Sequence, residues 1–136
     1  MKKLVLVPNR NRETFLVPEG VEEIGVFAFY EFKNLKTIGL PKSLERIGHR
    51  AFDSCEALEE IHLYENIKEI YYRAFDNCKS LKTAKIEAEN PPKFIGESSC
   101  GFDARLEKII LMVPRGSKQR YLRAKEWKKC KEIVEY

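Results

Sequence analysis

Apolar residues recur along this chain with a period of 23 residues. The clearest example is an Ala-Phe pair that ends at Phe29, Phe52 and Phe75. Eight apolar positions keep this register through three copies, and the unit reads L-x-x-I-G-x-x-A-F-x-x-C-x-x-L-x-x-I-x-L. A fixed period of this length is the signature of a repeat architecture, in which each unit buries its apolar face only against its neighbours. The pattern therefore predicts a solenoid.

A fourth copy of the unit follows, with an insertion. Ile95 restarts the pattern and Leu111 closes it. The steps from Ile70 to Ile95 and from Ile86 to Leu111 are both 25 residues rather than 23. We therefore place two extra residues before Ile95, near Pro91-Pro92, because adjacent prolines mark a loop.

The pattern within each unit predicts two extended segments and one short helical turn. Ile38 and Leu40 alternate with Thr37 and Gly39, which is the two-residue period of a strand. Residues 44–47 form a second short extended piece, and the steps of three to four residues within 51–58 predict a short helical turn. We predict that these repeat positions form the core: Ile47, Ala51, Phe52, Cys55, Leu58, Ile61, Leu63, Ile70, Ala74, Phe75, Cys78 and Leu81.

The two ends predict caps, which a solenoid needs because its terminal units would otherwise expose the core. Apolar stretches at 4–7 and 14–17 flank a polar turn and indicate an N-terminal hairpin. In the tail, Ser117 is a suitable N-cap for a helix that continues through Trp127. The alternative for this basic helix is contact with a membrane surface or an acidic partner. The predicted divisions are a cap and first strand at 1–17, repeats at 18–40, 41–63, 64–86 and 87–111, and a C-terminal cap at 112–136.

The repeat pattern resembles the BspA-like leucine-rich repeats of bacterial surface proteins over residues 14–114. The common leucine-rich repeat instead places an Asn or Cys two residues after the last strand leucine. The tail from Val113 also resembles the end cap of the BspA-like family. This resemblance implies an α/β repeat fold, a right-handed leucine-rich-repeat solenoid of about four 23-residue repeats with a C-terminal capping helix. It also implies a binding function, often adhesive and at a cell surface, and the pattern contains nothing catalytic.

Composition limits the class of protein further. The chain has 136 residues, of which 43% are apolar, so it can bury one domain's core without disulfides or metals. It has no apolar stretch long enough to span a bilayer. The four apolar residues at 4–7 are too few for a signal peptide. We therefore expect an unexported chain or a piece of a longer one, and the compartment stays open because the resemblance suggests the cell surface.

The basic charge lies at the two ends of the chain. Residues 1–17 carry a net charge of +3 and residues 112–136 carry +5, whereas the middle carries −4. A nucleic-acid-binding protein would be expected to gather its basic residues on one structured face. We therefore interpret the ends as solvated termini and expect no nucleic-acid partner. Contact of the basic tail with an anionic surface is the alternative.

Cysteine and histidine do not form a metal or catalytic pattern. There is no C-x-x-C pair, and His49 and His62 are the only histidines, so we expect no zinc site and no cofactor. Cys55 and Cys78 occupy an inward repeat position, and Cys100 falls in the column of the buried phenylalanines. Glycine-rich phosphate loops, G-x-S-x-G and H-E-x-x-H are also absent, so we expect a non-enzymatic protein. Cys130 lies among lysines that would lower its pKa if it were exposed, but a structural role is the simpler interpretation.

Binding by solenoids uses the extended face of their stacked strands. By parity, the outward positions fall into three columns: Thr14, Thr37, Glu60, Thr83 and Lys108; Leu16, Gly39, His62, Lys85 and Ile110; Pro18, Pro41, Tyr64, Glu87 and Met112. The predicted partner-binding residues are Glu60, His62, Tyr64, Lys85, Glu87, Ile110 and Met112. The alternative interpretations are ordinary surface variation and, for Ile110 and Met112, contact with the end-cap helix.

A second candidate surface lies on the opposite side of the unit. Tyr71-Tyr72-Arg73 replaces the Gly48-His49-Arg50 of the preceding repeat, and tyrosine and arginine favour interfaces. A locally repacked surface explains these residues equally well. The leading hypothesis for function is a non-enzymatic binding module for a protein or glycan partner, with the monomer favoured. The alternative is a structural segment of a longer solenoid or a self-associating unit.

Overall fold

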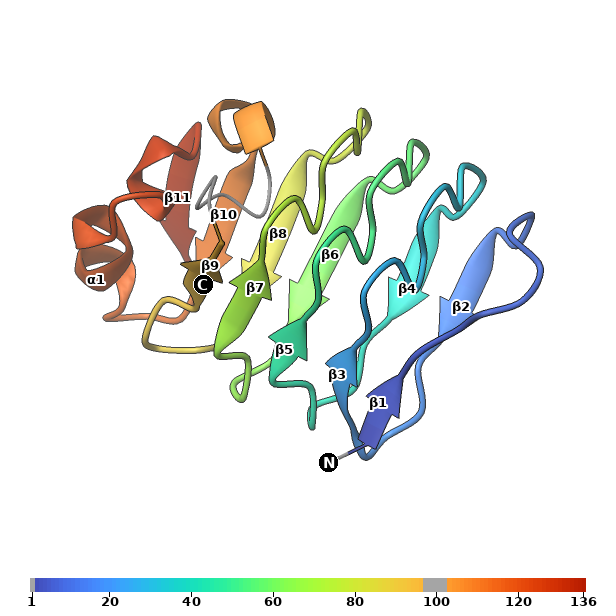
Figure 1. Ribbon diagram of the computed structural model, residues 1–136. Coiled ribbons are helices and arrows are strands. Elements are labelled where there is room, and N and C mark those ends of the chain that lie inside the picture. The colour runs from blue at the N-terminus through green and yellow to red at the C-terminus, as the bar shows by residue number, and fades with distance from the viewer. Residues whose placement is uncertain (1, 97–102) are drawn as a thin grey trace.

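The computed structural model describes residues 2–96 and 103–136 and is a parallel-sheet solenoid of about five turns (Figure 1). One wall is a five-stranded sheet of the order β1-β3-β5-β7-β9. Its strands are β1 (Lys2–Leu4), β3 (Val21–Ile24), β5 (Arg46–Ile47), β7 (Glu69–Tyr71) and β9 (Lys93–Ile95). The predicted repeat solenoid is thus confirmed, although with about five turns rather than four repeats.

The second wall consists of a four-stranded sheet of the order β11-β10-β8-β6 and the pair β2–β4, whose strand β4 contacts β6. Its strands are β2 (Thr14–Leu16), β4 (Thr37–Gly39), β6 (Glu60–Leu63), β8 (Thr83–Ile86), β10 (Ile110–Val113) and β11 (Glu132–Glu135). Every strand pair is parallel, and Thr14 faces Thr37 while Glu60 faces Thr83. The 23-residue period therefore sets the register of neighbouring turns.

The predicted N-terminal hairpin is wrong. Strand β1 pairs in parallel with β3 in the first wall, whereas β2 pairs in parallel with β4 in the second. The two segments do not pair with each other, because each continues the wall to which its repeat register assigns it. Residues 2–17 thus contribute the fifth turn that the four-repeat count omitted.

The core lies between the two walls. The twelve core positions named from the repeat are all at most 2% exposed. Phe29, Phe52 and Phe75 stack with nearly parallel rings, at centroid distances of 5.0 and 5.1 Å and interplanar angles of 2° and 3°. The Sγ of Cys55 donates to the carbonyl of Phe29 one turn earlier, at 3.2 Å. The inward column of cysteines thus joins neighbouring turns as well as filling space.

The short helical turn predicted within each repeat does not form. Arg50 and Ser54 have positive φ angles of 53° and 65°, and Arg73 and Asn77 repeat them one turn later. Left-handed residues break a right-handed helix after a few residues. The backbone N–H of Phe52 therefore donates to the carbonyl of Ala74 in the next turn, at 2.8 Å, rather than along its own segment.

The polar groups of these turns also join neighbouring units. Asp53 is only 1% exposed and accepts a hydrogen bond from Arg50 Nη1 at 2.7 Å. The side-chain amide of Asn77, one turn later, donates to Asp53 at 3.2 Å. A buried carboxylate is tolerated only when it is hydrogen-bonded and paired, as Asp53 is. This polar network is therefore part of what fixes the spacing of the turns.

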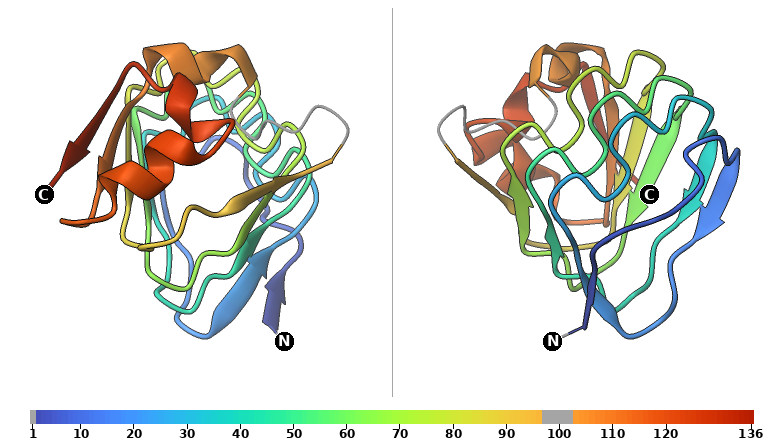
Figure 2. Two further views of the ribbon diagram at one scale, coloured as in Figure 1. Left: turned by 90° about the vertical axis from the view of Figure 1, so that its left-hand side faces the viewer. Right: turned by 45° about the vertical axis from the view of Figure 1, so that its right-hand side comes forward.

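At the C-terminal end the predicted single helix through Trp127 does not form. Helix α1 (Lys118–Arg123) is six residues long, the 3-10 turn η2 (Trp127–Lys129) follows, and β11 then pairs with β10. Figure 2 shows α1 lying across the end of the solenoid. The side chains of Tyr121 and Trp127 are buried there. The chain thus ends in a short helix, a turn and an added strand.

Ser117 stands at the N-cap position of α1, but its side chain does not cap the helix. Its hydroxyl instead donates to the carbonyl of Pro114 at 2.6 Å. The carboxylate of Glu135 accepts hydrogen bonds from the backbone N–H groups of Gly116 and Lys118, at 2.9 and 3.1 Å. The start of α1 is therefore held by the last strand, a contact between distant parts of the tail.

The register of the fourth copy also differs from the prediction. Phe94 faces Ile70, a step of 24 residues, where the prediction set Ile95 against Ile70. Leu111 faces Ala84, a step of 27, where the prediction set it against Ile86. One extra residue therefore precedes β9 and three more lie between β9 and β10, a stretch that includes the 3-10 helix η1 (Asp103–Lys108). Cys100, which the repeat pattern predicts to be buried, lies outside the described residues.

Candidate binding face

The outward surface of β6, β8, β10 and β11 is called here the strand face. Two rows of side chains run across it, set by the parallel register of the four strands. The first row is Glu60, Thr83, Ile110 and Glu132, and the second row is His62, Lys85, Met112 and Val134. Just beyond the strand ends lie Tyr64, Glu87 and Tyr136. The strand face thus brings together charged and aromatic side chains from four strands that are separated in the sequence.

Contacts within the strand face tie its strands together. His62 stacks on Tyr64 with ring centroids 4.2 Å apart, and its Nε2 lies 2.5 Å from Glu87 Oε2. The ammonium of Lys85 lies over the ring of Tyr136, 4.4 Å from the centroid. Burial, with a smaller contribution from the Glu87 carboxylate, raises the pKa of the Tyr136 phenol. The phenol therefore stays protonated at neutral pH and remains a hydrogen-bond donor.

The strand face combines apolar side chains with the carboxylates of Glu60 and Glu132, which form no ion pair in the described part of the chain. Ile110 and Met112 are half-buried, whereas Val134 is 37% and Tyr136 44% exposed. A hollow of about 150 Å³ lies beside Met112. It is lined by Glu60, Ile61, His62, Thr83, Lys85 and Met112. Such a hollow admits a small side chain rather than a whole ligand.

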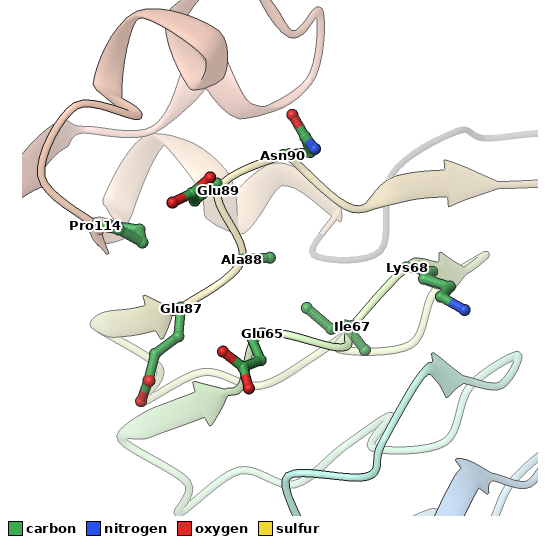
Figure 3. Close-up of a pocket in the computed structure, with 8 residues that line it drawn as sticks. All are labelled: Glu65, Ile67, Lys68, Glu87, Ala88, Glu89, Asn90 and Pro114. Atoms are coloured by element: carbon green, nitrogen blue, oxygen red, sulfur yellow. The ribbon is translucent and has the colours of Figure 1, made fainter.

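A larger hollow of about 430 Å³ adjoins the strand face, next to the residues that follow the C-terminal ends of β6 and β8. Figure 3 shows Glu65, Glu87 and Glu89 in its lining, with Lys68 on the far side. Glu87 therefore belongs to both surfaces. The hollow adds two exposed carboxylates to the edge of the strand face.

The structure brings together most of the predicted binding residues but changes their columns. Ile110 lies beside Thr83, in the row of Glu60, and not beside Lys85 as predicted. Met112 lies beside Lys85, in the row of His62, and not beside Glu87. Lys108 belongs to η1 rather than to a strand. These shifts follow from the longer insertion between β9 and β10. Strand β11 covers the far side of β10, so the predicted contact of Ile110 and Met112 with a helix is replaced by contact with a strand.

The repeat pattern does not reveal the contribution of β11. Glu132, Val134 and Tyr136 face outward from this strand beside Ile110, Met112 and Lys85. The adjacent β-branched residues Ile133 and Val134 are the signal for a strand here, because β-branched side chains favour extended backbone. The sequence places this run in the cap but shows no partner strand for it, because strand pairing is not visible in a sequence.

The second predicted surface, Tyr71-Tyr72-Arg73, lies at the end of β7 and in the turn that follows, on the wall opposite the strand face. All three residues are half-buried. Tyr72 stacks on His49 at 5.2 Å, and its hydroxyl accepts a hydrogen bond from Arg73 Nε at 2.7 Å. At the position of Gly48 in the preceding turn, a Cβ atom would lie 2.8 Å from the Ile24 carbonyl oxygen. The equivalent position in the next turn is Tyr71, which is the last residue of β7, whereas β5 ends at Ile47.

The described residues contain no cluster of three or more His, Cys, Asp or Glu side chains suited to a metal ion. Burial, together with the nearby Cys78 thiol, raises the pKa of Cys55 well above its ordinary range. A protonated thiol is a poor nucleophile.

Within 2–96 and 103–136, no helix has the length and apolar character needed to cross a membrane.

Comparisons with known proteins agree with this architecture. The model of the BspA type leucine rich repeat region matches residues 8–133 with six copies. The resemblance drawn from the repeat pattern is therefore confirmed, although with more copies than the four predicted. A comparison with curated protein sequences found no match.

Two solved structures are similar in fold. A leucine rich repeat protein of T. pallidum matches with a TM-score of 0.65 and 21% identity, over 97% of this chain and 73% of that protein. The pneumococcal vaccine antigen PcpA matches with a TM-score of 0.43 and 17% identity, over 99% of this chain and 44% of that protein. At this identity, the first of these likenesses establishes the fold alone.

Proposed function

Because the chain belongs to the BspA-type leucine-rich repeat family, we propose that it is a non-enzymatic interaction module that binds a protein or glycan partner through the strand face. Solenoids offer their stacked strands as extended binding surfaces. The observation that supports this site is the cluster formed by His62, Tyr64, Lys85 and Glu87 next to the exposed Tyr136. Aromatic and methionine side chains that are partly exposed and held in place are typical of interface anchors. Adhesion at a cell surface is the form of binding that the family resemblance favours.

The test is retention of purified extracellular-matrix proteins and glycans on the immobilised protein. We expect His62→Ala/Tyr64→Ala/Lys85→Glu to lose at least about tenfold in affinity for any partner that the wild type retains, since anchors and their charged neighbours dominate binding energy. The control is Phe27→Ser/Tyr71→Ala, which alters two aromatic residues away from the strand face, Phe27 in a turn and Tyr71 at the end of β7. Loss of the partner in the control and not in the triple variant would move the site to the Tyr71-Tyr72-Arg73 surface.

We also propose that α1, η2 and β11 act together as the C-terminal cap of the solenoid. The hydroxyl of Tyr121 donates to the carbonyl of Ala88 at 2.7 Å, and Trp127 Nε1 donates to the carbonyl of Pro92 at 2.9 Å. Both bonds reach the loop that leaves β8. Terminal units that cover the last turn are required for the solubility of repeat proteins.

A second proposal, assembly with another solenoid or with a second copy, is favoured by the N-terminal end. Leu6 and Leu16 are 80% and 77% exposed there, and β1 and β2 each pair on one side only. If assembly is the function, light scattering after size-exclusion chromatography will show a dimer of the 15.9 kDa chain. We expect Leu6→Glu/Leu16→Glu to convert that dimer to a monomer. A monomeric wild type at high concentration would contradict the self-associating form of this proposal.

A further inference from the structure

The charge of the strand face is opposite to that of the whole chain. The protein carries a net charge of +4. On the strand face, however, Glu60, Glu87 and Glu132 face outward with Lys85 as the lysine among them. Glu65 and Glu89 add two exposed carboxylates at the edge, where Glu89 lies 4.0 Å from Arg120 and Lys68 lines the same hollow. The strand face is therefore an acidic surface on a basic protein.

The two carboxylates of the first row are available to a partner. Glu60 and Glu132 are exposed, and neither forms an ion pair with another residue in the described part of the chain. They stand at the two ends of the row, with Thr83 and Ile110 between them. The positive charge of Lys85 is directed at the Tyr136 ring, so it does not neutralise either carboxylate by direct contact. A cation placed over this row would meet negative charge on both sides.

The centre of the strand face is apolar. Met112 and Val134 are neighbours in the second row, and Ile110 lies in the adjacent first row, on the same strand as Met112. The inner strands use their backbone groups within the sheet, so polar contacts must come from side chains. A glycan presents many hydroxyls that each need a donor or acceptor, and these three apolar side chains supply only the weak acceptor sulfur of Met112. An aliphatic or aromatic anchor matches this centre better.

We propose that the partner of the strand face is a cationic polypeptide segment, in which an aliphatic or aromatic residue covers Met112 and Val134 while lysine or arginine residues reach Glu60 and Glu132. This inference rests on the proposed function and names the chemistry of its partner. Charge complementarity at an interface sets specificity and accelerates association. The same charges disfavour acidic polysaccharides and nucleic acids on this face, because like charges brought together cost several kcal/mol.

The test is a selection of random dodecapeptides displayed on phage against the immobilised wild-type protein. Selected peptides are expected to be enriched in lysine and arginine and to carry at least one large apolar residue. Their affinity should fall about tenfold for Glu60→Gln/Glu132→Gln and should weaken as salt is raised, because exposed charges are screened over about 10 Å. The matched control Glu13→Gln/Glu56→Gln removes the same charge from other parts of the solenoid and should stay within twofold.

The outcomes separate this inference from the proposed function. Peptides that lose binding with Met112→Lys but not with Glu60→Gln/Glu132→Gln would overturn the cationic partner and leave the strand face as the site. Peptides indifferent to all of these changes would overturn both. A selection that returns acidic peptides, or no binder while a glycan binds the same face, would overturn the polypeptide assignment.

Discussion

Replacing Phe52 with alanine is expected to lower the free energy of unfolding by about 3 to 5 kcal/mol. Phe52 is fully buried, and its ring stacks between those of Phe29 and Phe75 at 5.0 and 5.1 Å. Removing the ring leaves a cavity that neighbouring turns cannot close, because their spacing is fixed by strand pairing on both walls. A domain of this size has a total stability of about 5 to 15 kcal/mol. The loss is therefore a large part of the whole.

Urea denaturation followed by the fluorescence of Trp127 measures this effect, since the chain contains a single tryptophan. Phe27→Ala is a matched control, because Phe27 is 45% exposed and we expect its loss to cost less than about 1 kcal/mol. Phe52→Leu fills part of the cavity and should fall between the two. A loss below 1 kcal/mol for Phe52→Ala would show that the stacked rings do not form the core.

Replacing Trp127 with alanine is expected to cost a similar amount, about 3 to 5 kcal/mol, but at one end of the molecule. Trp127 is 1% exposed, and its ring lies 4.6 Å from that of Phe94. Its Nε1 also donates to the carbonyl of Pro92. Because each solenoid turn contacts only its neighbours, the loss should open the last turns before the first. This prediction tests the proposed C-terminal cap.

Amide hydrogen exchange measures where the structure opens, and circular dichroism replaces tryptophan fluorescence in this variant. Protection in β10 and β11 should fall more than protection in β3 and β4. Trp127→Phe keeps an aromatic ring against Phe94 but removes the Nε1 donor, so we expect it to cost about 1 to 2 kcal/mol. An equal loss of protection in all strands would mean that the solenoid unfolds as one unit and that the tail is no separate cap.

The strand face could be predicted only in part. Parity placed Glu60, His62 and Lys85 on the outward side, and their parallel register is what the 23-residue period requires. The period fails between β9 and β10, and there the prediction put Ile110 and Met112 two residues away from their actual neighbours. A pattern that repeats without insertion fixes the register between two neighbouring strands, whereas an insertion leaves that register undetermined. The register then depends on how the inserted residues fold.

The turns show the same division. The sequence predicted that Ala51, Phe52 and Cys55 point inward, and all three are fully buried. It did not predict the left-handed residues Arg50 and Ser54, which end the local helical geometry. Spacing in a sequence records which side chains are buried. It does not record whether the backbone hydrogen bonds run along the segment or across to the next turn.

The sequence by itself determined that this protein is a solenoid, which side chains form its core and which face its strands present. It did so because a repeated apolar position can be buried only against its own copies. The tertiary structure decided the features that depend on single, unrepeated contacts. These are the parallel pairing of β1 with β3, the capping of α1 by Glu135 and the addition of β11 beside β10. Each joins segments whose relation no periodicity encodes, so only the folded chain brings them together.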